Sequence, residues 1–441
     1  MSIKQQPAHF SLIAVLFLIL GFFAVNAVGD RGEPAPSVDT ATDTSAGVST
    51  DAERLDLVDP AVVQYEERVT ELESSGGAFH LDLTEALVGL GSAYMSRGDY
   101  KSAEAAFRRA LHNSRVNYGL YCVEQLPILE PLIEVNSITG DWEDLDQIYH
   151  YLHWVSKRIY GAKDHRMLPV IERIGRWHLR SYTSGADDDA FPHLAAADQL
   201  FHEAIQIIEA NYGENDPRLL NPLYGIVLTS YQVASFLSRG GVVETSQRAG
   251  RSTAQVGRRQ SLETARFRED TILKAYIKGK AAMERIVAIH DASPDLPLES
   301  DALALVHLGD WYLLFNKWNS SQEAYSNAYE LLTASGLPQD DIDGFFARPR
   351  SLPAIPFLEE EGAGEVKVSE PTNSPYVLVT FDVSESGKAK NIKIVESNPE
   401  DSISLRRKAR NSVAAAKFRP RFVNGLPAEQ TGVSLRMVFN E

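Results

Sequence analysis

The chain has 441 residues, enough for two or more domains, and 44% of them are hydrophobic, enough to build buried cores. Its formal net charge of -17 argues against nucleic acid and anionic membrane surfaces as general partners. With Cys122 as the single cysteine, no internal disulfide can form, and we expect this residue to be a small apolar core side chain.

Residues 1–27 have the pattern of a targeting segment. Lys4 precedes an apolar run from Leu12 to Val25, and Val25-Asn26-Ala27 fits the rule for signal-peptide cleavage sites. The run is short for a membrane span, but residues 10–28 together could form an uncleaved anchor. A signal peptide and an N-terminal membrane anchor therefore both stay open, and both export the rest of the chain. Residues 28–54 are rich in Ser, Thr, Ala, Asp and Pro, which predicts a flexible tether.

Residues 55–336 repeat a helix-turn-helix pattern. Gly98-Asp99-Tyr100 separates two amphipathic segments, with small residues at Gly91 and Ala103 and an aromatic residue at Phe107. Gly140-Asp141-Trp142 repeats the break. A third unit around Leu308-Gly309, Trp318 and Tyr325 matches the first, and Tyr-Gly pairs recur at 118–119, 160–161 and 212–213. The pattern resembles the tetratricopeptide repeat (TPR), which predicts a mainly α solenoid of stacked helix pairs whose groove takes a peptide or a helix.

Two segments interrupt or follow the repeats. Residues 238–268 contain seven arginines and few apolar anchors, and predict an exposed loop or a helix extension with a solvated basic face. A clamp for an acidic partner is the alternative. Residues 337–365 are rich in Pro and Glu, and predict a semi-extended linker. A short strand near Val366 to Val368 is an additional expectation.

Residues 366–441 predict a small α+β domain in the order strand, strand, helix, strand. Alternating apolar residues mark strands over 377–383 and around Ile392 and Ile394, followed by a helix capped by Asp401 or Ser402 and a last strand over 433–439. Pro420 cannot extend the helix. Several arginines lie on the helix and just after it, and predict a solvated basic face, with docking of acidic groups as the alternative.

This segment resembles the C-terminal domain of the TonB family. The residues that carry the likeness are Phe381-Asp382-Val383, Gly387, Ile392 to Glu396, Lys417-Phe418-Arg419-Pro420, Asn424-Gly425-Leu426-Pro427 and the 433–439 strand. The resemblance implies capture of a short extended peptide from envelope or outer-membrane proteins by strand addition in the periplasm. The expected partner-binding residues are Val433, Leu435, Met437, Phe439, Arg406 and Arg410.

No residue pattern for catalysis, a cofactor or a metal holds up. HExxH, Walker A, GxSxG and paired-cysteine motifs are absent from the sequence. His150 and His153 are three residues apart on one predicted helix, but only Asp146 offers a partial third ligand. Asp187-Asp188-Asp189 lacks the alternating ligands and the glycine of a calcium loop. We therefore expect no enzyme, no cofactor and no metal site.

Three functions follow from these patterns. The first is a non-enzymatic periplasmic scaffold for protein–protein interaction. The second is a TonB-type energy transducer, for which the resemblance implies an anchor with a serine and a histidine one helical turn apart. The run from Leu12 to Val25 contains neither, and His9 and Ser11 lie before it in reversed order. The third, an envelope enzyme, has no supporting nucleophile or acid pair.

Overall fold

The computed structural model describes residues 59–184, 191–239, 254–354, 374–423 and 425–439. The predicted targeting segment 1–27 and tether 28–54 lie outside these residues. So do Asp187-Asp188-Asp189, the centre of the Arg-rich segment, the second part of the predicted linker and the expected strand at Val366 to Val368. The described residues divide into two compact units, one comprising 59–179 with 192–222 and the other comprising the described residues of 180–191 and 223–439.

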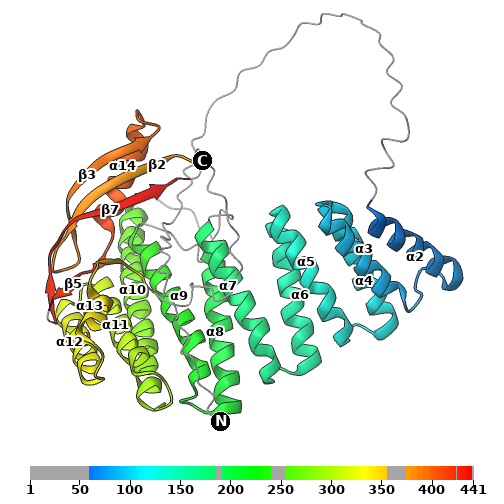
Figure 1. Ribbon diagram of the computed structural model, residues 1–441, viewed down its shortest axis with the longest axis horizontal. Coiled ribbons are helices and arrows are strands. Elements are labelled where there is room, and N and C mark those ends of the chain that lie inside the picture. Colours follow the sequence, from blue (N-terminus) through cyan, green and yellow to red (C-terminus); the bar gives the residue numbers. More distant parts are fainter. Residues whose placement is uncertain (1–58, 185–190, 240–253, 355–373, 424, 440–441) are drawn as a thin grey trace, which may run out of the picture. The chain divides into compact units, whose positions relative to one another are not determined.

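The helices up to residue 212 follow one another as antiparallel neighbours (Figure 1). A short 3-10 turn leads into each of the helices that begin at Leu126, Leu168 and Leu220. The helices are α2 Pro60–Gly76, α3 Leu83–Ser96, α4 Tyr100–Tyr118, α5 Leu126–Thr139, α6 Trp142–Tyr160, α7 Leu168–Ser184 and α8 Phe191–Tyr212. One hydrophobic core runs along α2 to α8, as a solenoid of stacked helix pairs requires.

The repeated Gly-Asp-aromatic breaks act as helix starts. The Asp99 side chain accepts a hydrogen bond from the Ser102 N–H (3.2 Å), and the Asp141 side chain accepts one from Asp144 (3.1 Å). Each aspartate thereby satisfies a backbone donor that the first helical turn leaves open. The predicted helix-turn-helix pairs are confirmed at α3–α4 and α5–α6.

Glycine brings paired helices close together at two equivalent positions. A Cβ added at Gly91 would lie 2.6 Å from the Phe107 ring, and one at Gly309 would lie 2.6 Å from the Tyr325 ring. Real Cβ atoms do not approach carbon this closely, so each aromatic ring occupies the space that a side chain would fill. The predicted packing of small against aromatic residues is correct in both of these helix pairs.

Further helices precede the C-terminal module: α9 Leu220–Ser238, α10 Ala254–Asp291, α11 Leu298–Leu314, α12 Trp318–Ala334 and α13 Gln339–Phe346. The described end of the Arg-rich segment is part of α10, where Arg266 is exposed. Part of the predicted linker is folded, because α13 buries Ile342 and Phe346 against α11 and α12. Across the described residues, no helix has the length and apolar character needed to cross a bilayer.

The C-terminal module has the predicted order of strand, strand, helix, strand. Its three-stranded antiparallel sheet has the order β3-β2-β7, built from β2 Tyr376–Val383, β3 Ala389–Asn398 and β7 Gln430–Val438. Helix α14, Ile403–Ala415, is capped by Ser402 and packs over β3 and β2 (Figure 1). Alternate residues of β2 are buried under it, so the module has its own core.

Short strands between α14 and β7 were not predicted. Helix α14 ends at Ala415, before Pro420, and the chain then forms β4 Phe418–Arg419, β5 Arg421–Val423 and β6 Leu426–Ala428. Strand β4 pairs with β1, Arg350–Ser351, and β5 pairs with β6 as a hairpin. The expectation that the residues just after the helix form a solvated basic surface is therefore wrong for Arg419, which is buried.

Candidate functional site

The outer edge of β7 is the candidate docking surface. Within the described residues β7 pairs with β2 alone, and it lies at one end of the sheet order. Its register is unbroken from Phe381↔Val433 to Tyr376↔Val438. These six consecutive pairs give a regular stretch of edge that an added strand could follow, and the register shifts once beyond it, between Phe381 and Val383.

The hydrogen-bond pattern tells which backbone groups face outward. The Phe439 N–H donates to the Pro375 carbonyl over 2.8 Å, which fixes the phase of the antiparallel ladder. Hydrogen-bonded and non-hydrogen-bonded residue pairs alternate along an antiparallel ladder. The N–H and C=O groups of Val433, Leu435 and Met437 therefore point to β2, as the N–H of Phe439 does. Those of the alternate residues, Ser434, Arg436 and Val438, point away from β2.

The side chains predicted to bind a partner lie in the core of the module. Met437 and Phe439 are buried, and Val433 and Leu435 are half-buried against the same core. They fix the face and register of β7 and leave recognition to its backbone. On the opposite face Ser434 is exposed and Val438 is half-buried.

Strand β3, the other edge of the sheet, is less suited to strand addition. Its pairing with β2 shifts register twice, and Asn391 has a φ of 51°. It also exposes Lys390 and Lys393. Bulges and lysines are features that protect natural edges from pairing, so β7 is the stronger candidate.

Side-chain contacts join all three strands at one end of the sheet. The Tyr376 hydroxyl donates to a Glu396 carboxylate oxygen, and this bond raises the pKa of Tyr376. The Arg436 guanidinium lies 4.2 Å from the centre of the Tyr376 ring. These contacts link β3, β2 and β7 on the face away from α14.

Arg406, one of the two predicted arginines, lies apart from β7. The Arg406 Nε donates to the Ser397 hydroxyl (2.8 Å), which holds α14 to β3 at the opposite edge of the sheet. Arg410, one helical turn later, is exposed. The structure therefore does not bring Arg406 to the β7 edge, and gives it a structural contact instead.

A buried charge cluster anchors the C-terminal module to the last helices. The Arg419 Nε donates to Asp310 Oδ1 (2.8 Å), and a second guanidinium nitrogen donates to Asp310 Oδ2. The Tyr325 hydroxyl also donates to Asp310 Oδ1, over 2.7 Å. Although burial opposes its charge, the adjacent carboxylate raises the pKa of Arg419, so the guanidinium keeps its charge.

Apolar and backbone contacts surround this cluster. Phe422 of β5 is buried against the core of α11 to α13, with its ring centre 5.0 Å from that of Tyr325. Lys417 donates to the Asn316 side chain over 2.7 Å. The module and the last repeat therefore share one packed interface, which sequence reasoning missed because its residues are about a hundred positions apart.

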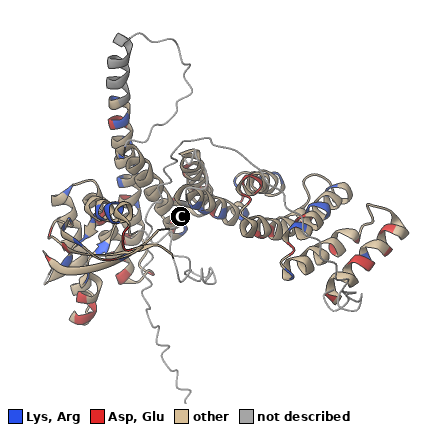
Figure 2. Cartoon of the chain, turned by 90° about the horizontal axis from the view of Figure 1, so that it is seen from above, with Lys and Arg blue, Asp and Glu red and all other residues tan. Residues whose placement is uncertain are grey.

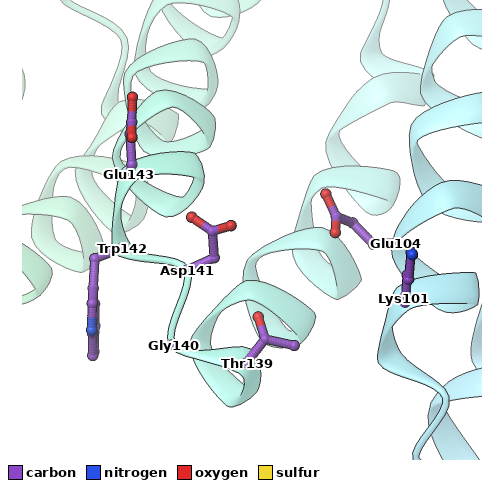
Figure 3. A pocket seen from close by; sticks show the side chains of 7 residues that line it. All are labelled: Lys101, Glu104, Thr139, Gly140, Asp141, Trp142 and Glu143. Atoms are coloured by element: carbon purple, nitrogen blue, oxygen red, sulfur yellow. The ribbon is translucent and has the colours of Figure 1, made fainter. Parts of the chain in front are cut away.

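In the other unit, a shallow depression lies between α4 and the turn before α6 (Figure 3). Its walls carry Lys101 and Glu104 on one side and Asp141 and Glu143 on the other. Figure 2 shows Lys and Arg interspersed with Asp and Glu along the helices of the chain. A polar peptide segment is the type of ligand that such an open, mixed-charge surface could hold.

Residues 373–440 match the family model described as the Gram-negative bacterial TonB protein C-terminal. No curated protein matches the sequence. Among solved structures, BtubC (BKLC) from P. vanneervenii aligns with 12% identity and a TM-score of 0.34, covering 65% of this chain and 93% of that one. TPR-like repeats of kinesin light chain type from Podospora anserina align with 10% identity and a TM-score of 0.36, covering 58% and 98%.

The two structural likenesses are loose, so the repeat architecture rests on the helix pairs and glycine contacts described above. The family match covers the segment in which the sequence pattern, the sheet order and the β7 edge agree. It supports a role in protein–protein interaction. The chain thus joins a helical-repeat region to a C-terminal module that is similar to the TonB C-terminal domain.

Proposed function

We propose that this protein is a periplasmic interaction scaffold whose β7 edge binds an extended segment of an envelope or outer-membrane transport protein by strand addition. The observation that carries the proposal is the regular register of β7 over six consecutive pairs, from Val433 to Val438, at the edge of the sheet. The helical repeats add a second surface for a peptide or helix of the same partner.

The backbone of β7 supplies only part of the binding free energy. The outward N–H and C=O groups of Ser434, Arg436 and Val438 provide six hydrogen bonds, worth roughly 3–9 kcal/mol in total at a net 0.5–1.5 kcal/mol each. Association itself costs an estimated 4–15 kcal/mol or so. Side-chain contacts beside the edge, or a second contact on the repeats, must supply the remainder, which favours a scaffold that binds one partner at two places.

The test uses the full chain and immobilised peptides taken from the periplasm-facing segments of outer-membrane transporters. Ser434→Pro removes an outward N–H and no bond to β2, while Ser434→Ala removes the side chain and keeps that N–H. We expect Ser434→Ala to bind within about twofold of the unchanged chain and Ser434→Pro to lose at least about tenfold, about the share of one to two hydrogen bonds.

Circular dichroism and thermal unfolding serve as the folding control, since both variants should retain the sheet. Equal peptide binding by the folded Ser434→Pro variant would overturn strand addition at β7. Leu435→Pro is unsuitable as a probe, because its N–H points to β2 and its loss would damage the module itself.

Export and anchoring are tested by the mature N-terminus. Mass spectrometry of the protein from a membrane-free periplasmic fraction should find a chain that starts at Val28, which is the outcome expected for a cleaved signal peptide. A full-length chain retained in the inner membrane would refute the soluble scaffold and favour the anchored transducer.

A further inference from the structure

A cluster of metal-binding side chain types lies in the repeat region, away from the C-terminal module. Asp146 of α6, His178 of α7 and His193 of α8 each offer one ligand atom, and these atoms all lie within 4.8 Å of one another. The three residues come from three successive helices. The packing of the repeat helices brings them together, and they form no local sequence motif.

The spacing of the two imidazoles suits a shared ion. Their Nδ1 atoms are 2.9 Å apart and share a hydrogen bond, in which one nitrogen donates and the other accepts. Two nitrogens bound at about 2.0–2.1 Å to a tetrahedral zinc ion are roughly 3.3–3.4 Å apart, so a movement of about half an ångström would make room for the metal.

Two further features prepare the cluster. His178 is buried between the helices, with 4% of the residue exposed, so water hardly reaches its ring. The Trp177 ring lies 4.6 Å from the His178 ring and 5.3 Å from the His193 ring, centre to centre, and limits their rotation.

A fourth group is within reach of the carboxylate. His150 Nε2 lies 3.5 Å from Asp146 Oδ2, and the His150 side chain is 70% exposed. It can swing toward the cluster or leave that position to water. His153, on the same helix, is engaged elsewhere, since its Nε2 lies 3.1 Å from Glu203 Oε2.

We propose that Asp146, His178 and His193 bind one divalent transition-metal ion of the zinc class, with His150 or water in the fourth position. Two nitrogens and one carboxylate oxygen favour Zn²⁺ and similar ions over Mg²⁺ and Ca²⁺, which prefer oxygen ligands throughout. An ion at this point would tie α6, α7 and α8 together and stiffen the repeat. The inference does not depend on strand capture by β7.

The experiment titrates metal-free full-length protein with Zn²⁺ and Co²⁺, using isothermal calorimetry and the visible absorption of bound Co²⁺. We expect one ion per chain, bound in the micromolar range or tighter. His193→Gln and Asp146→Asn, both at half-buried positions that should tolerate the change, are expected to weaken binding at least about tenfold each. His153→Gln is the matched control and should leave the affinity unchanged.

Thermal unfolding gives an independent measure. Zn²⁺ should raise the Tm of the unchanged chain and of His153→Gln, and should raise it much less in His193→Gln. Binding that is absent, that has millimolar affinity typical of single surface histidines, or that persists unchanged in the Asp146→Asn/His193→Gln double variant would overturn the proposal.

Discussion

The ion pair between Arg419 and Asp310 should determine whether the C-terminal module stays attached to the last helices. Both side chains are buried, and the guanidinium makes two hydrogen bonds to the carboxylate. Replacing Arg419 with Met keeps much of the side-chain volume and removes the charge. The Asp310 carboxylate is then left buried with the Tyr325 hydroxyl as the hydrogen-bond donor shown to reach it.

The size of the effect follows from the cost of an uncompensated buried charge. Removing one partner of a buried pair typically costs about 3–5 kcal/mol, whereas replacing both partners with apolar residues is often neutral. We therefore expect Arg419→Met to lower the free energy of opening at this interface by about 3–5 kcal/mol. The double variant Asp310→Leu/Arg419→Met should recover most of that loss.

Hydrogen–deuterium exchange of the full chain is the suitable assay, because a chain with two units need not unfold in one step. The reporter amide is that of Leu352, which lies outside the module and donates to the Lys417 carbonyl (2.9 Å). A loss of 3 kcal/mol speeds its exchange by roughly 100-fold or more. Acceleration below about tenfold, or a double variant that exchanges faster than Arg419→Met, would refute the reasoning.

Other substitutions and conditions test neighbouring parts of the structure. Phe422→Ala removes a buried ring between two aromatic side chains of the last helices and should cost about 3–5 kcal/mol in the urea-induced unfolding of that unit, with little effect on amides of the β2–β7 ladder. The methyl group added by Gly91→Ala would overlap the Phe107 ring, so this change should lower the free energy of unfolding by about 1–3 kcal/mol. In a double-mutant cycle, Phe107→Leu should recover part of that loss. Burial, Arg419, Arg350 and His290 hold the pKa of His307 well below its usual value, so the unfolded chain takes up this proton near pH 6.5 and the folded chain does not. The contribution of neutral His307 to the free energy of unfolding is therefore present above pH 6.5. Below pH 6.5 the free energy of unfolding falls by at most about 1.4 kcal/mol per pH unit because of this group. A His307→Gln variant should therefore lose less stability than the unchanged chain between pH 6.5 and 5.

The sequence was sufficient for elements whose cause is local. A glycine, a capping aspartate and an aromatic residue end one helix and begin the next at Gly98-Asp99-Tyr100 and at Gly140-Asp141-Trp142. The alternation over residues 433–439 likewise places β7 and the face it buries. In each case the residues that decide the structure lie within a few positions of one another.

Burial of Arg419 could not be predicted because its cause is distant. The residue lies in a run of basic side chains, and a solvated surface is the ordinary environment of such a run. Only Asp310, which is 109 positions away, makes its burial tolerable. The short strands β4 and β5 exist for the same reason, since one pairs with β1 and the other inserts Phe422 among the last helices.

The histidines show the same limit. Sequence spacing placed His150 and His153 together because they are three positions apart on one helix. The structure instead pairs His153 with Glu203, 50 residues away, and gathers Asp146 with His178 and His193 from neighbouring helices. Helix periodicity describes one helix face, whereas the contacts of a solenoid depend on how successive helices are rotated against one another.

The shared interface also decides how the β7 edge can be studied. A fragment limited to residues 366–441 would expose Phe422 and leave Arg419 without the Asp310 carboxylate, and it would lose the β1 partner of β4. An exposed aromatic ring favours nonspecific association, so both binding and its absence in such a fragment would be ambiguous. Substitutions such as Ser434→Pro in the full chain avoid this problem, because they change the open edge and keep the anchored module intact.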